Sequence, residues 1–278
     1  MVQPSSPTRD RACPFCEREN SAAVPSPNSA EGWKLTRCPR CRFTYLANPV
    51  DYEALDKEHA WEVSSVKENQ RKRERDPRLH VISGWMKWFR KRVLKRNKLG
   101  TLIRAHFSSG NVLDIGCAGG GILKVLPASM VPHGIEISET LYKKAAKVCG
   151  KRGGLAVHTD GLSGLRQFQD GMFSGIIMSA YLEHEVQPMA VLRECKRTLR
   201  DGGRAIVKVP NYASLSRVVR GKNWPGMRLP EHVNYFTPRS LRGMITNAGL
   251  RIERFKLRDR SPISDTLWLV ARKDDLPR

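Results

Sequence analysis

Residues 111–121 read N-V-L-D-I-G-C-A-G-G-G, and this stretch decides the fold class. Residues 111–116 have the composition of a short buried strand, and they run directly into a glycine-rich turn. The apolar residues 122–126 that follow have a helix-like pattern. A strand, a glycine turn and a helix in this order form the nucleotide-binding layout of α/β proteins, in which glycines let a ligand approach the backbone. The stretch therefore predicts an α/β fold with a cofactor site at the turn.

Two carboxylates end the first two predicted strands. Asp114 lies at the end of the first strand, where it can offer a negative charge to the cationic amino-acid end of a ligand. Residues 131–137 read as the second strand, and Glu136 lies 22 residues after Asp114. An acid at this spacing can bind both hydroxyls of a ribose. The pair predicts a nucleoside-containing cofactor.

The glycine turn and a later segment resemble class I S-adenosylmethionine-dependent methyltransferases. V-L-D-I-G-C-A-G-G-G is similar to their motif I, D-x-G-x-G-x-G, with Ala118 in place of the middle glycine. Residues 173–184, F-S-G-I-I-M-S-A-Y-L-E-H, resemble their fourth strand and the loop after it, with Ser174 in place of the usual Asp. The resemblance spans about residues 105–273 and implies a Rossmann-like sheet.

The remaining elements follow in the order that this family shows. Residues 188–199 have a helical pattern closed by Asp-Gly-Gly, and residues 204–211 read as the fifth strand. A helix begins after Thr237, a candidate N-cap, with Pro238 in its first turn, and it ends near Gly249. Two last strands, residues 250–257 and 267–271, predict the antiparallel terminal hairpin at the edge of the sheet.

The resemblance also implies the cofactor and its contacts. S-adenosylmethionine is the expected methyl donor, and Glu136 is expected at its ribose. Asp160, after a third strand at residues 155–159, is either a contact of the adenine amine or a turn acid before Gly161. The residues expected around the amino-acid end of the donor are Asp114, Gly116, Ala118 and Gly120.

The methyl acceptor is less well indicated. Residues 224–238, W-P-G-M-R-L-P-E-H-V-N-Y-F-T-P, resemble a bacterial branch that often carries an N-terminal zinc ribbon. This branch modifies sugars, surface polysaccharides, lipids and other small metabolites, and quinone-biosynthesis O-methyltransferases are similar to a smaller degree. We therefore expect O-methylation of a small-molecule, glycan or lipid acceptor. Ala118 and Ser174 leave open a degenerate scaffold without activity.

An acceptor hydroxyl needs a base, and two histidines are candidates. His184 and His232 lie in loops expected at the carboxyl edge of the sheet, although a loop histidine can equally make a structural hydrogen bond or bind substrate. Glu183 can contact substrate or cap a helix. The aromatic residues that can line an acceptor pocket, or belong to the core instead, are Tyr181, Trp224 and Tyr235.

Four cysteines near the N-terminus form two C-P-x-C pairs. Cys13 and Cys16 precede Cys38 and Cys41 by a 21-residue interval. Two such turns bring four thiolates to one point, which suits a structural Zn²⁺ and leaves no coordination position open for catalysis. Residues 33–37 and 42–46 are the expected strands of this zinc ribbon. Zinc ribbons usually have Gly after the last Cys, whereas this chain has Arg42.

The net charge is +22, and residues 67–104 contribute 14 Lys/Arg against 3 Asp/Glu. Within this segment the apolar residues follow helical spacing, as Leu79, Ile82, Met86, Phe89 and Val93. Such a helix can cover the cofactor cleft, lie on a membrane surface or meet nucleic-acid phosphates. The alternative function is therefore an RNA (rRNA-type) methyltransferase. Against it, the fourth-strand loop reads S-A-Y-L rather than the N/D-P-P-Y/F of enzymes that methylate base amines.

The predicted organisation has three parts. Residues 1–50 form a zinc-ribbon module with a disordered start, residues 51–104 a basic helical linker or cap, and residues 105–278 the methyltransferase domain. No secretory apolar region begins the chain and no run of about 18 apolar residues occurs. We therefore expect a cytoplasmic protein. The sequence does not indicate an oligomeric state.

Overall fold

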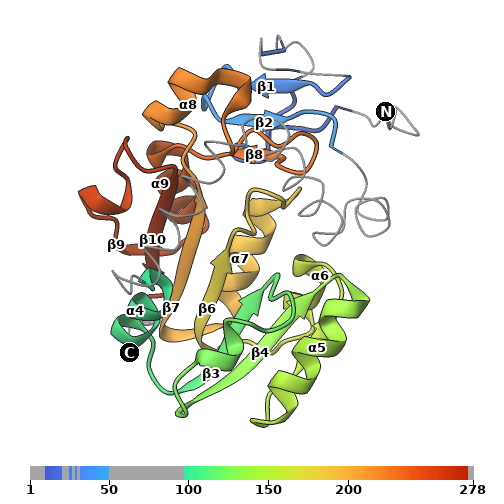
Figure 1. Ribbon diagram of the computed structural model, residues 1–278, viewed down its shortest axis with the longest axis vertical. Coiled ribbons are helices and arrows are strands. Elements are labelled where there is room, and N and C mark those ends of the chain that lie inside the picture. Colours follow the sequence, from blue (N-terminus) through green and yellow to red (C-terminus); the bar gives the residue numbers. More distant parts are fainter. Residues whose placement is uncertain (1–9, 21–24, 27–28, 30–31, 50–96, 275–278) are drawn as a thin grey trace, which may run out of the picture.

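The computed structural model describes residues 10–20, 25–26, 29, 32–49 and 97–274. The larger sheet has the strand order β5-β4-β3-β6-β7-β10-β9 (Figure 1). Its strands are β3 (Gly110–Ile115), β4 (Met130–Glu136), β5 (Ala156–His158), β6 (Phe173–Ser179), β7 (Leu199–Pro210), β9 (Arg251–Arg254) and β10 (Thr266–Arg272).

The pairing of the strands confirms the predicted Rossmann-like fold. Strands β5, β4, β3, β6 and β7 run parallel to their neighbours, whereas β10 pairs antiparallel with both β7 and β9. The antiparallel terminal hairpin is thus present. From β3 the chain adds β4 and β5 on one side of the sheet and then β6 and β7 on the other, so the strand order reverses at β3. Ligands bind α/β sheets at such a switch point.

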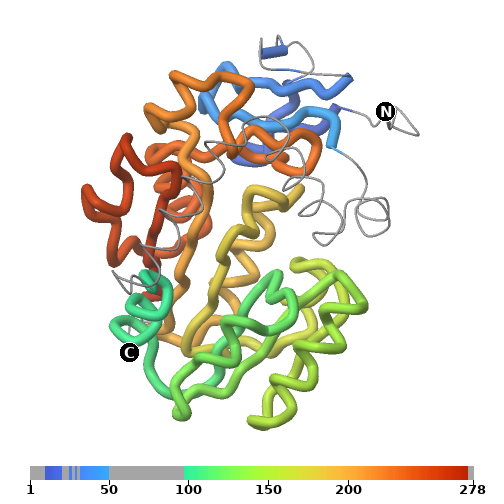
Figure 2. The backbone as a smooth tube through the Cα atoms, viewed as in Figure 1, coloured from blue at the N-terminus to red at the C-terminus, as the bar shows by residue number. Residues whose placement is uncertain are grey.

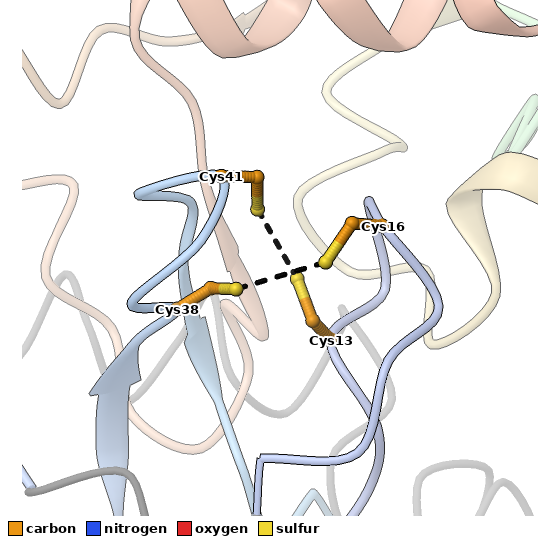
Figure 3. A group of neighbouring side chains, drawn as sticks. All are labelled: Cys13, Cys16, Cys38 and Cys41. Carbon is orange, nitrogen blue, oxygen red and sulfur yellow. Dashed lines mark hydrogen bonds between the residues drawn. The ribbon is translucent and has the colours of Figure 1, made fainter.

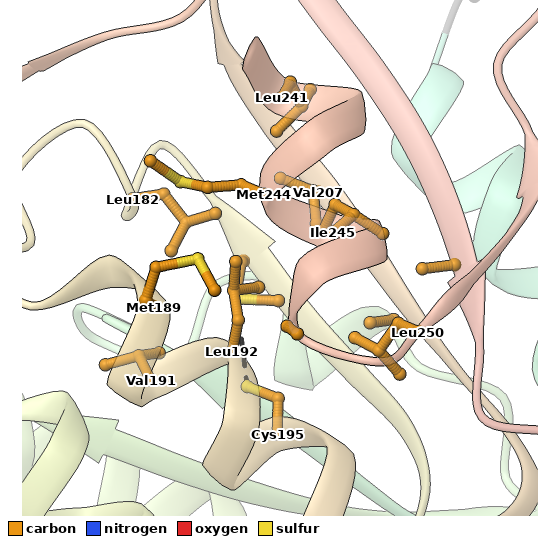
Figure 4. Close-up of a cluster of buried hydrophobic side chains, with 14 of the residues drawn as sticks. Leu182, Met189, Val191, Leu192, Cys195, Val207, Leu241, Met244, Ile245 and Leu250 are labelled. Atoms are coloured by element: carbon orange, nitrogen blue, oxygen red, sulfur yellow. Dashed lines mark hydrogen bonds between the residues drawn. The ribbon is translucent and has the colours of Figure 1, made fainter. Parts of the chain in front are cut away.

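Helices cover both faces of this sheet. One face packs on α6 (Gly161–Arg166), α7 (Pro188–Thr198) and α9 (Pro238–Asn247), and the other on α4 (Lys98–His106) and α5 (Glu139–Gly150). Strand side chains alternate between the two layers, so Leu113 joins the first core and Val112 the second. Figure 4 shows α7 and α9 meeting through Leu182, Met189, Met244 and other apolar side chains.

The segment after the glycine turn differs from the prediction. Instead of a helix over residues 122–126, a single 3-10 turn, η1 (Leu123–Val125), follows the turn. Leu126 leaves it in an extended conformation with φ −64° and ψ 143°. Pro127 comes next, and a residue before proline is disfavoured in the helical region, which explains why the helix does not continue.

The N-terminal ribbon is built partly by the larger domain. Strands β1 (Leu35–Arg37) and β2 (Thr44–Leu46) pair antiparallel, slightly shorter than predicted. A third strand, β8 (Asn234–Tyr235), joins β2 from far along the chain. Beside it lie α8 (Leu215–Arg220) and η2 (Gly221–Asn223), and the tube in Figure 2 shows this region together with the ribbon.

The ribbon and the larger domain share one hydrophobic core. Phe43 packs on Phe236 with ring centroids 5.4 Å apart, and both side chains are fully buried. Phe15 lies against α9 at Gly243, where a Cβ atom would come within 2.7 Å of its ring. The two modules predicted from the sequence therefore pack as one unit, and the glycine makes room for the contact.

Two predicted features lie outside the described part of the chain. The amphipathic helix from Leu79 to Val93, and most of the basic segment 67–104, fall among residues that the structure does not describe. Residues 97–104 of that segment begin α4, whose Leu102 and Ile103 are buried in the second core. Among the described residues, none of the helices is long and apolar enough to span a membrane.

Candidate functional site

A cleft of about 490 Å³ opens at the carboxyl ends of β3, β4 and β6. The glycine turn after β3 forms one wall, with Gly116, Cys117 and Ala118. The ends of β4 and β5 form a second wall through Glu136 and Asp160. The cleft lies at the topological switch point of the sheet, as the sequence pattern predicts.

Asp114 is a buried carboxyl at the base of the cleft. The residue is 1% exposed, and its Oδ2 atom has no hydrogen-bond partner among the described residues. Burial, with a smaller contribution from the neighbouring Glu136, raises the pKa of Asp114 to about 8. An unpaired buried carboxylate is costly, so a cationic ligand group at this point would relieve the cost. Asp114 thus fits the cationic end of a cofactor.

Glu136 ties the second strand to the glycine turn. One of its carboxylate oxygens accepts a hydrogen bond from the backbone N–H of Ala118 at 2.7 Å, and the other accepts from the backbone N–H of Ser138 at 3.0 Å. Ala118 has φ 47°, a left-handed conformation that favours glycine. This geometry explains why the related motif has a glycine at this position, and the Glu136 bond holds the alanine in it.

Tyr181 closes the cleft on the side of β6. A Cβ atom on Gly161 would lie 1.9 Å from the Tyr181 hydroxyl, and one on Gly116 would lie 3.2 Å from its ring. These two glycines therefore leave room for the tyrosine. Its hydroxyl donates a short hydrogen bond to Glu185, and Glu185 also accepts from the backbone of Gln187 at 2.7 Å. The ring is consequently fixed in the cleft wall.

The four N-terminal cysteines converge, as Figure 3 shows. Their sulfur atoms all lie within 4.8 Å of one another, with Cys13 to Cys41 at 3.5 Å and Cys16 to Cys38 at 3.7 Å. Tetrahedral coordination with Zn–S bonds of about 2.3 Å places sulfur atoms roughly 3.8 Å apart. The side-chain hydrogen bond with Cys41 and burial raise the pKa of the Cys13 thiol. The cluster has the spacing of a metal site with four thiolate ligands.

Both cysteine turns contain a left-handed residue directly after the second cysteine. Glu17 has φ 56° and Arg42 has φ 60°. The backbone N–H of each donates to the carbonyl of the first cysteine of its turn, at 2.8 Å and 2.9 Å. The departure from Gly at position 42 therefore leaves the turn intact, at the cost of backbone strain.

A family model described as a methyltransferase domain matches residues 86–254, which is more than half of the chain. The chain belongs to this methyltransferase family. The match includes Asp114 and Glu136 and the loops that carry His184 and His232. The protein is an S-adenosylmethionine-dependent methyltransferase enzyme.

Similar proteins agree with this assignment. The methyltransferase is 29% identical over 181 residues to the ubiquinone biosynthesis O-methyltransferase of Xylella fastidiosa strain M23, covering 62% of this chain and 73% of the relative. Its fold is similar to that of a SAM-dependent methyltransferase from Archaeoglobus fulgidus, with TM-score 0.50, 19% identity and coverage of 68% of this chain and 99% of the other. It is also similar to YcgJ from Bacillus subtilis, with TM-score 0.50, 16% identity and coverage of 64% and 98%.

Two candidate histidines, His184 and His232, lie together at the part of the cleft that His184, Glu185 and Glu231 line. We call this part the far wall. His184 lines the cleft, whereas His232 is 5% exposed behind it, and their rings meet edge to face with centroids 4.7 Å apart. Burial, followed by the charge of Arg228, lowers the pKa of His184 to about 4. His184 is therefore neutral near pH 7.

The loops that carry these histidines are fastened together. Asn234 donates from its side-chain amide to the carbonyls of Leu182 and Glu185, at 2.8 Å and 2.6 Å. The backbone N–H of Val233 donates to the carbonyl of Glu183 at 2.8 Å. The loop after β6 and the loop before β8 therefore hold one another in place.

All but one of the predicted cofactor residues gather in one place. Asp114, Gly116, Ala118, Glu136 and Asp160 line the cleft. Asp160 also caps α6, accepting from the backbone of Ser163 at 2.9 Å. Gly120 is not among the lining residues and faces α5 instead, where a Cβ atom would be 3.3 Å from Val148.

The three aromatic residues expected either in an acceptor pocket or in the core lie in two different places. Tyr181 lines the cleft, but Trp224 and Tyr235 are 2% and 3% exposed and pack with Leu35 in a third core. Trp224 donates from its indole to Asp265 at 2.9 Å. Tyr235 belongs to the core because it lies in β8, which pairs with the ribbon, and Trp224 packs in the same cluster.

Sequence reasoning missed three charged residues around the far wall. Glu185 and Glu231 line the cleft, and Arg228 forms a short ion pair with Glu231. Glu185 lies four residues after Tyr181, a spacing that could have indicated the contact. No local pattern marks Arg228 or Glu231, since their positions depend on how residues 224–233 fold back.

Proposed function

We propose that this methyltransferase transfers a methyl group from S-adenosylmethionine to a hydroxyl oxygen of a small-molecule, glycan or lipid acceptor. One observation carries the proposal. The cleft has a buried carboxylate, Asp114, at its motif I end and a neutral imidazole, His184, at its far wall. The similarity to ubiquinone biosynthesis O-methyltransferases supports a small-molecule acceptor.

The donor end of the cleft fits S-adenosylmethionine. This cofactor supplies an electrophilic methyl group on a positively charged sulfur. Asp114 would bind its amino-acid ammonium, because the Oδ2 atom is buried and receives no hydrogen bond from the described residues. Gly116 and Ala118 would lie beside the amino-acid end, Glu136 would face the ribose, and Asp160 the adenine.

The far wall would handle the acceptor. The Nδ1 atom of His184 lies 2.9 Å from the carbonyl of Glu231, and a carbonyl can only accept, so Nδ1 carries the hydrogen. Its Nε2 atom is then an acceptor for a hydroxyl proton. Tyr181 and Glu185, fixed by their mutual hydrogen bond, line the cleft beside His184.

We also propose that Cys13, Cys16, Cys38 and Cys41 hold a structural Zn²⁺. Their converging sulfur atoms support this assignment, and a shell of four thiolates leaves no open coordination position. The ribbon would then stabilise β8 and, through it, the loop that contains His232.

The acceptor class can be tested with labelled methyl donor. The purified chain and methyl-labelled S-adenosylmethionine are added to extracts of cells that lack the protein, and RNA, protein, lipid, glycan and small-molecule fractions are separated. We expect label in the small-molecule, lipid or glycan fraction. Label confined to RNA would contradict the proposal and support the nucleic-acid alternative suggested by the basic segment.

Matched variants make this experiment specific. His184→Gln should retain cofactor binding and lose most of the transfer, since the imidazole at the far wall is gone. His106→Gln is the control, because His106 lies in α4 and pairs with Glu253 at 2.7 Å, away from the cleft lining. Equal transfer by both variants would exclude His184 from the reaction.

A further inference from the structure

Glu183, His184 and His232 form a second cluster of metal-type ligands, separate from the cysteines. One carboxylate oxygen and one ring nitrogen of each histidine lie within 4.8 Å of one another. Glu183 and His184 come from the turn after β6, and His232 comes from the loop before β8. Because these loops are hydrogen-bonded to each other through Asn234 and Val233, the cluster is held by the fold.

Both histidines present the tautomer that a metal ligand needs. The Nδ1 atom of His184 lies 2.9 Å from the carbonyl of Glu231, and Nδ1 of His232 lies 2.9 Å from the carbonyl of Gly226. Since a carbonyl only accepts, each Nδ1 carries hydrogen and each Nε2 keeps its lone pair. Metal-binding histidines usually donate their second N–H in this way, which fixes the ring and its tautomer.

One oxygen of the carboxylate in this cluster lacks a hydrogen-bond partner among the described residues. Glu183 is 2% exposed, and its Oε2 atom has no hydrogen-bond partner within the described part of the chain. Arg228 is near enough to act on its charge, but this guanidinium already forms a short ion pair with Glu231. The other cation acting on Glu183 is Lys208, which lies 5.6 Å over the Trp268 ring. A buried carboxylate in this state is costly without a cation.

We propose that Glu183, His184 and His232 bind a divalent first-row transition-metal cation at the far wall of the cleft. Two neutral imidazoles and one carboxylate form a donor set that suits such cations. Donor atoms that lie within 4.8 Å of one another can reach one cation at about 2.0–2.2 Å after small side-chain movements. Of the three residues His184 lines the cleft, so a cation held by them would lie beside the cleft wall.

The cation would act on the methyl acceptor at the far wall of the cleft. This role rests on the proposed function, in which the acceptor is a hydroxyl compound. When bound, the cation would supply Lewis-acid chemistry that lowers the pKa of an acceptor hydroxyl, with Glu183, His184 and His232 holding the cation. With the cation bound, Nε2 of His184 would be its ligand in place of the base that this atom provides in the metal-free chain. Metal binding itself does not depend on the acceptor being a hydroxyl compound.

Direct binding of Co²⁺ to the full-length chain tests the site. The metal that remains after treatment with a weak chelator is first counted by elemental analysis, and Co²⁺ is then titrated by equilibrium dialysis and absorption. We expect one additional Co²⁺ per chain, with weak visible bands and without the intense thiolate-to-cobalt band that binding at the cysteines would give. His184→Ala, His232→Ala and Glu183→Gln should each weaken Co²⁺ binding at least tenfold.

Controls separate a lost site from a lost fold. Binding of S-adenosylmethionine by each variant shows whether the cleft is still formed, and His106→Gln should bind Co²⁺ like the wild type. The absence of additional Co²⁺ in the wild-type chain, a thiolate-to-cobalt band, or undiminished binding in all three variants would each overturn the proposal. None of these readouts uses methyl transfer, so a wrong acceptor class would leave the metal result intact.

Discussion

At the residue scale, Asp114 and Glu136 are neighbouring carboxylates with different tasks. Both carboxylate oxygens of Glu136 accept backbone N–H bonds, from Ala118 and Ser138, whereas Oδ2 of Asp114 has no partner among the described residues. Burial and the neighbouring carboxylate raise the pKa of Asp114 to about 8, so the two acids are not equivalent near neutral pH. The unsatisfied one is the one placed for a cationic ligand.

Asp114→Asn should therefore raise the stability of the fold and lower the affinity for the cofactor. A carboxyl whose folded pKa lies above its unfolded value destabilises the fold as pH rises from about 4 through 8, because the unfolded chain ionises first. The amide removes this penalty, so we expect a higher Tm for the variant at pH 8 than for the wild type without ligand. Affinity for S-adenosylmethionine should fall at least tenfold, measured by calorimetry.

The pH dependence provides the check on this interpretation. Wild-type affinity should increase from pH 6.5 to 8.5 as Asp114 ionises, and the Asn variant should lose that part of the increase. Glu139→Gln is a suitable control, since Glu139 is exposed and pairs with Lys143 on the surface of α5. An unchanged pH profile in Asp114→Asn would mean that Asp114 does not meet the ligand.

Ala118 offers a second test at this scale. Its φ of 47° costs a non-glycine residue about 1 kcal/mol, partly offset by the entropy that a glycine loses on folding. We expect Ala118→Gly to keep cofactor affinity within threefold and to raise the free energy of unfolding by up to about 1 kcal/mol. Ala118→Val, which is strained in this conformation, should lower both quantities in chemical denaturation and binding assays.

At the scale of elements, Arg11 connects the ribbon to both loops of the far wall. Its guanidinium donates to the carbonyls of Leu46, Val186 and Val233, at 2.9, 2.7 and 2.7 Å. It also donates to the side chain of Asn234 at 3.2 Å. One side chain thus joins β2, the loop after β6 and the start of β8.

Arg11→Ala should loosen these elements together. Three carbonyls would each lose one hydrogen bond, although that of Val233 still accepts from the backbone N–H of Leu46 at 2.9 Å. We expect the chain to be less stable by about 2–4 kcal/mol, since hydrogen bonds from charged groups contribute about 1.5–3 kcal/mol each and are not additive. Hydrogen exchange should increase at Val233 and Asn234. Arg193→Ala, which removes the exposed pair with Glu17, is the control, and equal effects of the two would contradict this role.

The packing of α9 shows the same dependence on context. Thr237 caps this helix through a capping box with Ser240, as its sequence position suggests. The face of α9 that contains Gly243 is buried because Phe15 of the ribbon packs against it. No residue spacing within the helix indicates this partner. An element can thus be recognised locally while its partner cannot.

At the scale of the whole molecule, the ribbon and the methyltransferase sheet form one core. Cys13, Cys38, Phe43 and Tyr45 belong to the same hydrophobic cluster as β6, α7 and α9. A small ribbon that binds no metal has too little core of its own to remain folded. Loss of a metal bound by the cysteines should therefore destabilise β8 and the His232 loop as well as the ribbon.

Removing the proposed Zn²⁺ from the cysteine cluster should weaken both the ribbon and β8. We expect a strong chelator, or Cys38→Ser, to lower Tm by several degrees and to increase hydrogen exchange in β8. Cofactor affinity should remain within threefold, because the Asp114 end of the cleft is formed by β3 and β4. Cys195→Ser, a buried cysteine outside the cluster, is the control for the loss of a thiol. An unchanged β8 in the metal-free chain would show that the ribbon does not support it.

The local sequence determined the order of the strands, the glycine turn, the capped helix α9 and the four converging cysteines. The glycine turn, the cap of α9 and each cysteine turn are encoded within a few residues, whereas the order of the strands follows from the resemblance to the methyltransferase family. Asp114, Gly116, Ala118, Glu136 and Asp160 reached the cleft for the same reason, since parallel strands end at one edge of the sheet.

Only the tertiary structure decided how His184, His232 and Glu183 come together, and that β8 completes the ribbon. These contacts join segments that lie far apart in the chain, and their formation depends on burying Phe43, Phe236 and Trp224 in shared cores. Such burial is non-directional and leaves no periodic pattern in either partner segment. The sequence by itself therefore determined the cofactor end of this enzyme, and long-range packing decided its far wall.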